Sequence, residues 1–340
     1  KNECINVREN IGINDIHNFA KYNISGKDSR KWLDILFAGK IPKPGKLSLT
    51  PMLSPKGRII GDFVTSCINE EEFLLTSSFG MQAFHTRWFQ KNLSEKFSVK
   101  FKNISNSLSG FQIVGPKSIE LLERVTNTNL SKNSFKFMNL KHIKIGKLKV
   151  LIQRISYTGS LGFEIYINKN DQINLYKIFL EEGKNFYMKP FGSRAIMSLR
   201  LEKSFGAWGR EFRPNFTPAE TKLDRFVSYD KNENFFGKTY AKIEKLNGSS
   251  RILSSFIVDS DDADVWFDEP IWYNQNIIGF VTSGGYAHYS KKSLALGFIP
   301  SDMASKDLEV EIEILGKKRK AILINEALYD PKNNQLYSIQ

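Results

Sequence analysis

The feature that most restricts the fold is a change in the pattern of apolar and turn-forming residues near residue 249. From there on, short apolar runs of strand type alternate with turn-forming residues at regular spacing. These runs cover residues 251–258, 271–273, 277–282, 293–299, 308–314 and 318–323. Short strands spaced in this way are typical of an antiparallel barrel or sandwich. We therefore expect a separate all-β domain, with its boundary near residues 246–250.

The part before this boundary mixes strands and helices. A strand, a glycine-containing turn and a helix follow one another at residues 22–36 and again at residues 111–125. Residues 81–93 have the apolar period of an amphipathic helix, and residues 135–145 are typical of a strand. A chain of 340 residues is long enough for two or three domains. The sequence thus predicts an α+β fold.

A turn followed by a strand lies in the middle of the chain, at residues 156–166. Gly159 and Gly162 bracket the turn, with Tyr157 just before it and Glu164 just after it. The two side chains can face one pocket, where a carboxylate accepts two hydrogen bonds from the donor edge of a pterin. The alternative is an ordinary hairpin with an exposed Glu164 and a core Tyr157, because short motifs often occur without function.

Asp62 is the second candidate, because it interrupts an otherwise apolar strand before Phe63 and Val64. A carboxylate in such a strand is costly to bury unless it is paired or functional. Beside a pocket it could orient an amine nucleophile or exchange a proton with it. On an edge strand it would simply face solvent. The residues alone leave both interpretations open.

Several function classes lack their motifs. The chain has no glycine-rich dinucleotide turn, no Gly-Lys-Ser/Thr phosphate loop and no Gly-x-Ser-x-Gly elbow, and its four histidines lack metal-ligand spacing. These absences argue against a nicotinamide or flavin enzyme with its own dinucleotide site, an ATPase, a zinc hydrolase and a serine hydrolase. We expect no metal site.

Charge and cysteine content restrict the partners and the compartment. The net charge is +13, but the lysines are spread among acidic residues and no nucleic-acid-binding signature occurs. No apolar run is long enough to span a bilayer, and two cysteines suit a reducing compartment. We expect a cytoplasmic protein that binds neither nucleic acid nor membranes.

Three segments resemble the tetrahydrofolate-dependent aminomethyltransferase family, whose best-known member is the T-protein of the glycine cleavage system. They are the Leu-Arg-Leu-Glu-Lys and Trp-Gly-Arg-Glu stretches of residues 199–211, the turn and strand of residues 157–164, and residues 279–297. Their order and spacing hold over essentially the whole chain. Residues 264–271 and the Trp-Gly-x-Glu stretch look closer still to the C-terminal folate domain of dimethylglycine and sarcosine dehydrogenases.

The resemblance implies a three-domain cloverleaf around a central folate cavity. Two of its domains would be α/β domains with antiparallel sheets, and the third a C-terminal antiparallel β-barrel. Residues 1–45 and 110–245 would form the part that carries the pterin-binding turn. Residues 46–109 would carry Asp62, and residues 250–340 would form the barrel.

The resemblance also implies roles for individual residues. Asp62 matches a catalytic aspartate that is held to activate the folate amine, and Glu164 matches the carboxylate that holds the pterin. Tyr157 and Tyr329 match aromatic residues of the cavity. The expected cofactor-binding residues are Tyr157, Glu164, Phe19, Ser78, Arg200, Trp266 and Tyr329.

At other positions the chain departs from the T-protein pattern. Gly61 stands in place of the first of two adjacent aspartates, and Ile196 and Trp266 stand in place of arginines. Ser78 replaces an asparagine and Phe19 replaces a methionine. These changes leave folate binding as the expectation. They argue against the T-protein's own substrate, the aminomethyl-lipoyl arm of a carrier protein.

The expected function is therefore tetrahydrofolate-dependent one-carbon transfer. The donor would be a methylated amine such as dimethylglycine or sarcosine, or a carrier-bound aminomethyl group. Because family members usually have preceding sequence, a flavin-dependent dehydrogenase is expected as a missing N-terminal domain or as a separate partner. The alternatives are a non-catalytic folate-binding module and a folate-dependent demethylase of a sulfonium or methoxy substrate.

Overall fold

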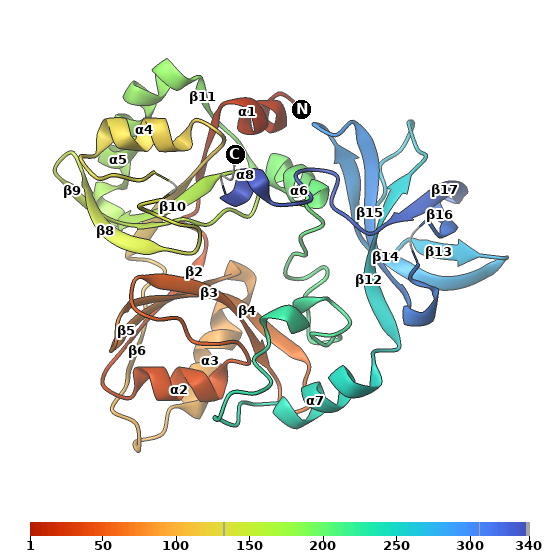
Figure 1. Cartoon of the computed structure of the whole chain (residues 1–340), viewed down its shortest axis with the longest axis horizontal. Coiled ribbons are helices and arrows are strands. Elements are labelled where there is room, and N and C mark those ends of the chain that lie inside the picture. Colours follow the sequence, from red (N-terminus) through yellow and green to blue (C-terminus); the bar gives the residue numbers. More distant parts are fainter. Residues whose placement is uncertain (132, 306, 338–340) are drawn as a thin grey trace.

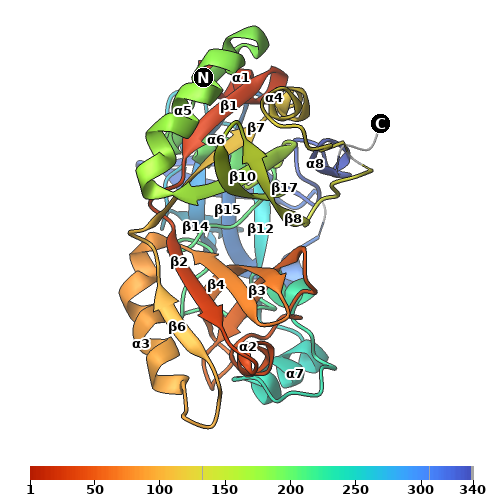
Figure 2. The same ribbon diagram turned by 90° about the vertical axis from the view of Figure 1, so that its left-hand side faces the viewer.

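The computed structural model describes residues 1–131, 133–305 and 307–337. These residues form a six-stranded sheet, a five-stranded sheet and a closed β-barrel, with helices packed around them. Figure 1 shows the two sheets as separate lobes on the left and the barrel as a third lobe on the right. In the side view of Figure 2 the two sheets lie one above the other, in front of the barrel. The predicted α+β class is confirmed.

The six-stranded sheet has the strand order β11-β1-β7-β10-β9-β8. Neighbouring strands are antiparallel, except that β1 pairs with β11 in parallel at one edge. The strands are β1 (Ile11–Asp15), β7 (Leu108–Val114), β8 (Leu140–Ile145), β9 (Leu148–Gln153), β10 (Gly162–Asn168) and β11 (Met188–Pro190).

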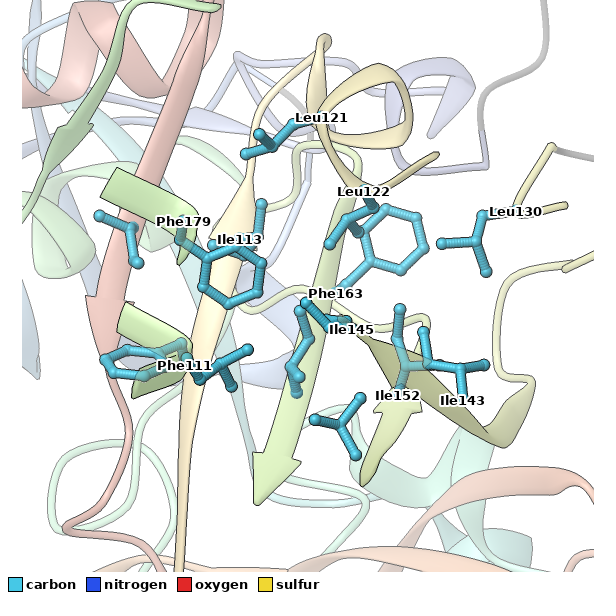
Figure 3. Packing of buried hydrophobic residues seen from close by; sticks show 14 of the residues in the cluster. Phe111, Ile113, Leu121, Leu122, Leu130, Ile143, Ile145, Ile152, Phe163 and Phe179 are labelled. Carbon is cyan, nitrogen blue, oxygen red and sulfur yellow. The ribbon is translucent and has the colours of Figure 1, made fainter. Parts of the chain in front are cut away.

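One face of this sheet is covered by two helices, α4 (Ser118–Val125) and α5 (Gln172–Gly183). Figure 3 shows their side chains, Leu121 and Phe179 among them, packed with Phe163 of β10. Because side chains alternate between the faces of a strand, this packing directs Glu164 and Tyr166 to the opposite face. That face packs toward the five-stranded sheet, since Tyr166 shares a buried cluster with Leu74 of that sheet.

The strand expected at residues 135–145 begins only at Leu140. Met138 has a φ of 62°, in the left-handed region, which an extended strand does not accommodate. The N–H of Phe135 donates to the carbonyl of Ser131 in a turn, yet the Phe135 side chain is buried. The first apolar residues of this segment are therefore apolar because they are buried, and they do not form a strand.

The five-stranded sheet has the strand order β3-β4-β5-β2-β6. Helices α2 (Ser29–Leu36) and α3 (Gln82–Asn92) pack on it through an aromatic core that contains Trp32, Phe63 and Phe89. The strands are β2 (Ala20–Ser25), β3 (Lys46–Leu53), β4 (Ile59–Asn69), β5 (Glu72–Ser77) and β6 (Lys100–Asn103).

The domain boundary expected at residue 45 is misplaced. Strand β2 and helix α2 precede residue 45, but β2 pairs with β5 and β6 and therefore belongs to the five-stranded sheet. Only α1 (Asn2–Glu9) and β1 from this stretch belong with the six-stranded sheet. The chain crosses between the two sheets just after β1, where the sequence shows no linker-like composition.

The barrel is closed in the order β12-β15-β14-β13-β16-β17, with β17 returning to β12. Its pairs are antiparallel, and its interior includes Phe256, Ile271 and Ile312. The predicted all-β domain is thus a barrel and not a sandwich. The strands are β12 (Arg251–Val258), β13 (Pro270–Tyr273), β14 (Asn276–Ala287), β15 (Lys292–Pro300), β16 (Glu309–Ile314) and β17 (Lys317–Ile324).

Helix α6 (Ser193–Glu202) connects the six-stranded sheet with the barrel. It packs against α1 through Leu199, and the hydroxyl of Ser198 donates to the carbonyl of Tyr286 on β14 over 2.8 Å. The remaining helices are α7 (Lys238–Asn247), which leads into the barrel, and α8 (Asn334–Tyr337). Among the described residues, no helix combines the length and apolar character needed to cross a membrane.

Candidate functional site

Asp62 lies on β4 opposite Pro51, just before the pairing of β4 with β5 begins at Val64. The register of β3 and β4 skips Ile60, which makes a β-bulge two residues before Asp62. Bulges next to functional sites re-aim side chains. Because Phe63 is in the core of the five-stranded sheet, Asp62 is directed to the other face of β4.

Asp62 is half-buried, and one of its two carboxyl oxygens is desolvated. Its Oδ1 atom is buried and has no hydrogen-bond partner in the part of the chain that the structure describes. Burial raises the pKa of Asp62 to about 7, because a carboxylate loses its hydration in such a place. The group is therefore not the freely solvated carboxylate of an edge strand, and it can exchange a proton near neutral pH.

His85 of α3 fixes the backbone next to Asp62. Burial lowers the pKa of His85 to about 4, so the ring is neutral at pH 7. Its Nε2 lies 2.9 Å from the carbonyl oxygen of Ile60 and donates to it, while Nδ1 lies 3.3 Å from the Ser77 hydroxyl and accepts from it. A Cβ on Gly61 would lie 2.9 Å from Nε2. Position 61 therefore has no room for a second acid.

Tyr157 lies in the turn before β10, and its hydroxyl donates to the carbonyl of Gly206 over 2.8 Å. Burial raises the pKa of this hydroxyl well above its ordinary value. The positive charge of Arg200 opposes the rise, and the negative charges of Glu211 and Asp62 add to it. Tyr157 and Asp62 therefore lie close enough to interact electrostatically, although they come from different sheets.

Glu164 is almost fully buried, with 5% of the residue exposed. Its Oε2 accepts from the Tyr166 hydroxyl over 2.7 Å, and its Oε1 accepts from the Gln112 amide over 3.3 Å. Gln112 and Gln153 are its pairing partners on the two neighbouring strands, so the three side chains form one row, here called the polar row. In this row, Oε1 of Gln112 and both amide atoms of Gln153 are buried without a partner among the described residues.

Lys21 is a charged group that interacts electrostatically with Glu164 of the polar row. It is fully buried, and its Nζ donates to the carbonyls of His17 and Phe19 over 2.7 and 2.8 Å. Burial lowers the pKa of Lys21 to about 8, while the charges of Asp15 and Glu164 oppose the shift. The pKa of Glu164 is raised by burial in turn, against the charge of Lys21 and two hydrogen bonds. The Phe19 ring packs in the cluster between the sheets.

Asp62 and Glu164 interact with different groups. Each has its own electrostatic neighbours, which are Tyr157 for Asp62 and Lys21 for Glu164. No hydrogen bond joins the two carboxyl groups in the described part of the chain. The expectation that both acids serve one central cavity therefore remains a prediction.

Arg200, which we expected at the cofactor, is held inside the protein. Its Nη1 donates to the Phe205 carbonyl over 2.9 Å and to Glu211 over 3.2 Å, and its Nη2 donates to the Ser283 hydroxyl over 2.6 Å. These contacts join α6, the loop after it and β14 of the barrel. Arg200 thus holds the loop whose Gly206 carbonyl receives the Tyr157 hydroxyl.

Tyr329 covers a buried ion pair that sequence reasoning missed. The guanidinium carbon of Arg8 lies 3.5 Å from the centre of the Tyr329 ring, and its Nη2 lies 2.8 Å from Oε2 of Glu202. Arg8 also donates to the Thr158 carbonyl and the Ser160 hydroxyl in the turn that carries Tyr157. The sequence offered one indication of this ion pair. Arg8 follows Cys4 by four residues, so on a helix it lies on the same face as this residue, which is buried.

Trp266 and Ser78 lie apart from these groups. Trp266 is 61% exposed, and its ring lies 5.3 Å from that of Phe267. Ser78 follows β5, beside a hollow of about 480 Å³ lined by Phe79, Gly80, Gln82, Ala83, Thr86 and Asn103. Among the described residues, neither side chain forms a hydrogen bond or ring contact with Asp62, Tyr157 or Glu164.

Two sheets that carry Asp62 and Glu164, with a closed barrel beside them, form the architecture expected of the tetrahydrofolate-dependent aminomethyltransferase family. The family model described as "GCVT N-terminal domain" matches residues 1–231, and the one described as "Glycine cleavage T-protein C-terminal barrel domain" matches residues 251–330. The chain belongs to the glycine cleavage T-protein family. The family predicted from the sequence is confirmed.

Two curated relatives illustrate the range of the family. The chain is 36% identical over 333 residues to human mitochondrial dimethylglycine dehydrogenase, covering 97% of this chain and 38% of that protein. It is 31% identical over 330 residues to an aminomethyltransferase of Natranaerobius thermophilus, covering 96% of this chain and 89% of that protein. The chain thus spans about two fifths of the length of the dimethylglycine dehydrogenases that it matches.

A solved structure has the same fold. The aminomethyltransferase T of the glycine cleavage system from Bartonella henselae superposes with a TM-score of 0.87, over 97% of this chain and 89% of that chain. The two sequences are 22% identical, so this likeness bears on the fold alone.

Proposed function

We propose that this chain is a tetrahydrofolate-dependent one-carbon transferase that takes its one-carbon unit from a methylated amine such as dimethylglycine or sarcosine. One observation carries the proposal. Asp62 has a buried, unpartnered Oδ1 and a pKa near 7, and it lies within electrostatic reach of Tyr157. A carboxyl group in such a state can take a proton from a bound amine at neutral pH.

The polar row offers the groups that would hold a pterin. A pterin presents a 2-amino group, a ring N–H and a carbonyl oxygen along one edge. The Glu164 carboxylate can accept from the donors, and the unpartnered amide of Gln153 can both donate and accept. The unpartnered Oε1 of Gln112 adds a further acceptor. Buried polar groups without partners are rare, and a ligand that pairs with them removes their desolvation cost.

Tetrahydrofolate, when bound, supplies the amine nitrogen that accepts the one-carbon unit. An amine is nucleophilic only when it is unprotonated and correctly placed. Asp62 would orient this nitrogen and take its proton, and positioned proton transfer of this kind contributes roughly 100- to 10,000-fold in rate. Because the amino edge and the reactive nitrogen are on different parts of the folate, Asp62 and Glu164 can both serve it without touching each other.

The donor and partner follow from the relatives. One of them is named a dimethylglycine dehydrogenase, and this chain matches only part of its length. We infer that a flavin-dependent dehydrogenase acts before this chain, either as a preceding domain or as a separate protein. Its flavin would take two electrons from the methylated amine and leave a methylene iminium, whose carbon the folate nitrogen then attacks with release of the demethylated amine. A carrier-bound aminomethyl group is the other donor that the family supports. The two free, buried cysteines suit a reducing compartment such as the cytoplasm.

The test is a screen of donors with the purified chain and tetrahydrofolate. Dimethylglycine, sarcosine and a sulfonium compound are each supplied with and without a flavin-dependent dehydrogenase. We expect a rise in melting temperature with tetrahydrofolate, and formation of methylene-tetrahydrofolate from a methylated amine when the dehydrogenase is present. A thermal shift without turnover of any donor would point to a non-catalytic folate-binding module. Turnover of the sulfonium alone would point to a demethylase, and no shift at all contradicts the proposal.

A further inference from the structure

A small cavity lies between the loop after α6 and the barrel. Its volume is about 70 Å³, and its lining residues are Gly209, Arg210, Arg213, Phe267, Asp268 and Thr282. This is room for roughly two water molecules, and therefore for a carboxylate group but not for a pterin. The cavity shares no residue with the polar row, and its lining is rich in guanidinium groups.

The two arginines of this cavity lack polar partners. In the described part of the chain, neither the Arg210 nor the Arg213 side chain forms a hydrogen bond or an ion pair, and Nε of Arg213 is buried. Their guanidinium carbons lie 3.9 Å from the ring centre of Phe267 and 5.0 Å from that of Phe216, respectively. Such ring contacts occupy the face of a guanidinium group and leave its in-plane N–H donors free.

The nearby acids do not neutralise these arginines. Glu211 stands between them in the sequence, but its Oε1 accepts from the Thr282 hydroxyl over 2.6 Å. Its Oε2 accepts from the backbone N–H of Ala207 and from Arg200. Asp268 lines the cavity but is exposed and forms no ion pair with either arginine among the described residues. Two cations without counter-charges in a small cavity are the usual features of an anion-binding site.

The loop that carries the arginines also contacts the proposed folate site. Its residue Gly206 accepts the hydrogen bond of the Tyr157 hydroxyl, and its residues Gly209, Arg210 and Arg213 line the cavity. The backbone N–H groups of Gly209 and Phe212 hold this loop in a compact turn by donating to Phe212 and Ala207. A group bound at the cavity is therefore connected to Tyr157 through a short, well-bonded segment.

We propose that Arg210 and Arg213 form a carboxylate-binding site for a ligand of the proposed transferase. The carboxylate comes either from the glutamyl part of folate or from the amino-acid donor, and the inference rests on the proposed function for both. An arginine fork pairs with both oxygens of a carboxylate, which a lysine does not reproduce. The cavity then holds the carboxylate end of the ligand.

The experiment measures dissociation constants by calorimetry for four ligands. Tetrahydrofolate is compared with tetrahydropteroate, which lacks the glutamate. Sarcosine is compared with dimethylamine, which lacks the carboxylate, with tetrahydropteroate present in both cases. The proteins are the wild type, Arg213→Leu, Arg213→Lys and Arg210→Leu. The control is Arg124→Leu, because the Arg124 side chain is 65% exposed and pairs with Glu182 on the six-stranded sheet's helices.

If the folate tail binds there, Arg213→Leu weakens tetrahydrofolate binding by roughly 10- to 100-fold and leaves tetrahydropteroate unchanged. If the donor binds there, sarcosine binding weakens and dimethylamine binding does not. Arg213→Lys recovers only part of either loss, and Arg124→Leu changes nothing. The inference is overturned if folded Arg213→Leu and Arg210→Leu proteins, checked by their melting temperatures, bind all four ligands as the wild type does. A wild type that binds neither folate compound overturns the proposed function itself.

Discussion

Asp62 lies within electrostatic reach of the Tyr157 hydroxyl, although the two residues are 95 positions apart and belong to different sheets. Burial raises the pKa of this hydroxyl, and the negative charges of Glu211 and Asp62 add to the rise. Asp62 is on β4 of the five-stranded sheet, and Tyr157 precedes β10 of the six-stranded sheet. Their proximity brings an ionisable group of near-neutral pKa next to the turn that leads to the polar row. This arrangement is what connects the two halves of the proposed site.

Asp62→Asn is expected to keep folate binding but to lose one-carbon transfer. The amide has the same shape but cannot take a proton, so turnover should fall by roughly 100- to 10,000-fold. The measurement is single-turnover transfer together with calorimetric binding of tetrahydrofolate. Asp230→Asn, at an exposed position, is the matched control. Full activity in the Asp62→Asn protein would remove Asp62 from the mechanism.

Asp62 should also make the stability of the protein depend on pH. Its folded pKa of about 7 lies above the unfolded value near 4, so the native state holds a proton that the unfolded chain has released. The contribution of Asp62 to the free energy of unfolding therefore falls as pH rises from about 4 to 7. Asp62→Asn should stabilise the protein by roughly 1–3 kcal/mol more at pH 8 than at pH 5, measured by urea unfolding. Equal effects at both pH values would contradict the raised pKa.

His85→Leu should reduce turnover without much change in tetrahydrofolate affinity. It removes the donor to the Ile60 carbonyl beside the bulge, which lets the Asp62 carboxyl shift. Small displacements of this kind cost roughly 10- to 100-fold in rate. His85→Gln retains an N–H donor and should recover much of the rate. The split between kcat and KM is the measurement, and a Leu variant with wild-type kcat would remove His85 from this positioning role.

Arg8→Met should destabilise the protein by roughly 3–5 kcal/mol, because it leaves the Glu202 carboxylate buried without its cation. The ion pair of Arg124 with Glu182 provides the comparison, since the two side chains are 65% and 37% exposed. Arg124→Met should cost less than about 1 kcal/mol. Urea unfolding of both variants gives the two numbers. Similar values for the two variants would mean that the buried ion pair contributes no more to stability than the exposed one.

Glu164→Gln should remove most of the thermal shift that tetrahydrofolate produces. The substitution keeps the size of the side chain but removes the negative charge that accepts from the pterin donors. Charge-assisted hydrogen bonds account for roughly a 10- to 100-fold difference in affinity. Glu181→Gln, at a side chain that is 73% exposed, should leave the shift unchanged. An undiminished shift in Glu164→Gln would place the pterin elsewhere.

The alternation of apolar residues and turns predicted those helices and strands that are determined by their own residues. The regular short strands after residue 249 predicted the barrel, because each strand carries its own alternation and its own turn. The place where the chain crosses between sheets was not predictable in this way. Strand β2 belongs to the five-stranded sheet because of its partners β5 and β6, and a strand's own sequence does not specify its partners.

The two acidic residues of the candidate site could be predicted from the sequence, but the residues that surround them could not. Asp62 and Glu164 are recognisable in the sequence as charged residues within apolar strands. Glu164 is buried, which is rare for a charged residue, and Asp62 is half-buried with its Oδ1 atom buried. Gln112 and Gln153 became candidates only through strand pairing, since they are 41 positions apart in the sequence. Arg200 resembled a ligand-binding residue, but tertiary contacts to Glu211 and Ser283 occupy it.

The most direct test of the account is a crystal structure of the chain in complex with tetrahydrofolate. We predict that the amino edge of the pterin lies within hydrogen-bond distance of the Glu164 carboxylate, with the reactive nitrogen on the side of Asp62. Density for the folate at another place on the protein, or an Asp62 carboxyl turned away from the bound folate, would contradict the central claim.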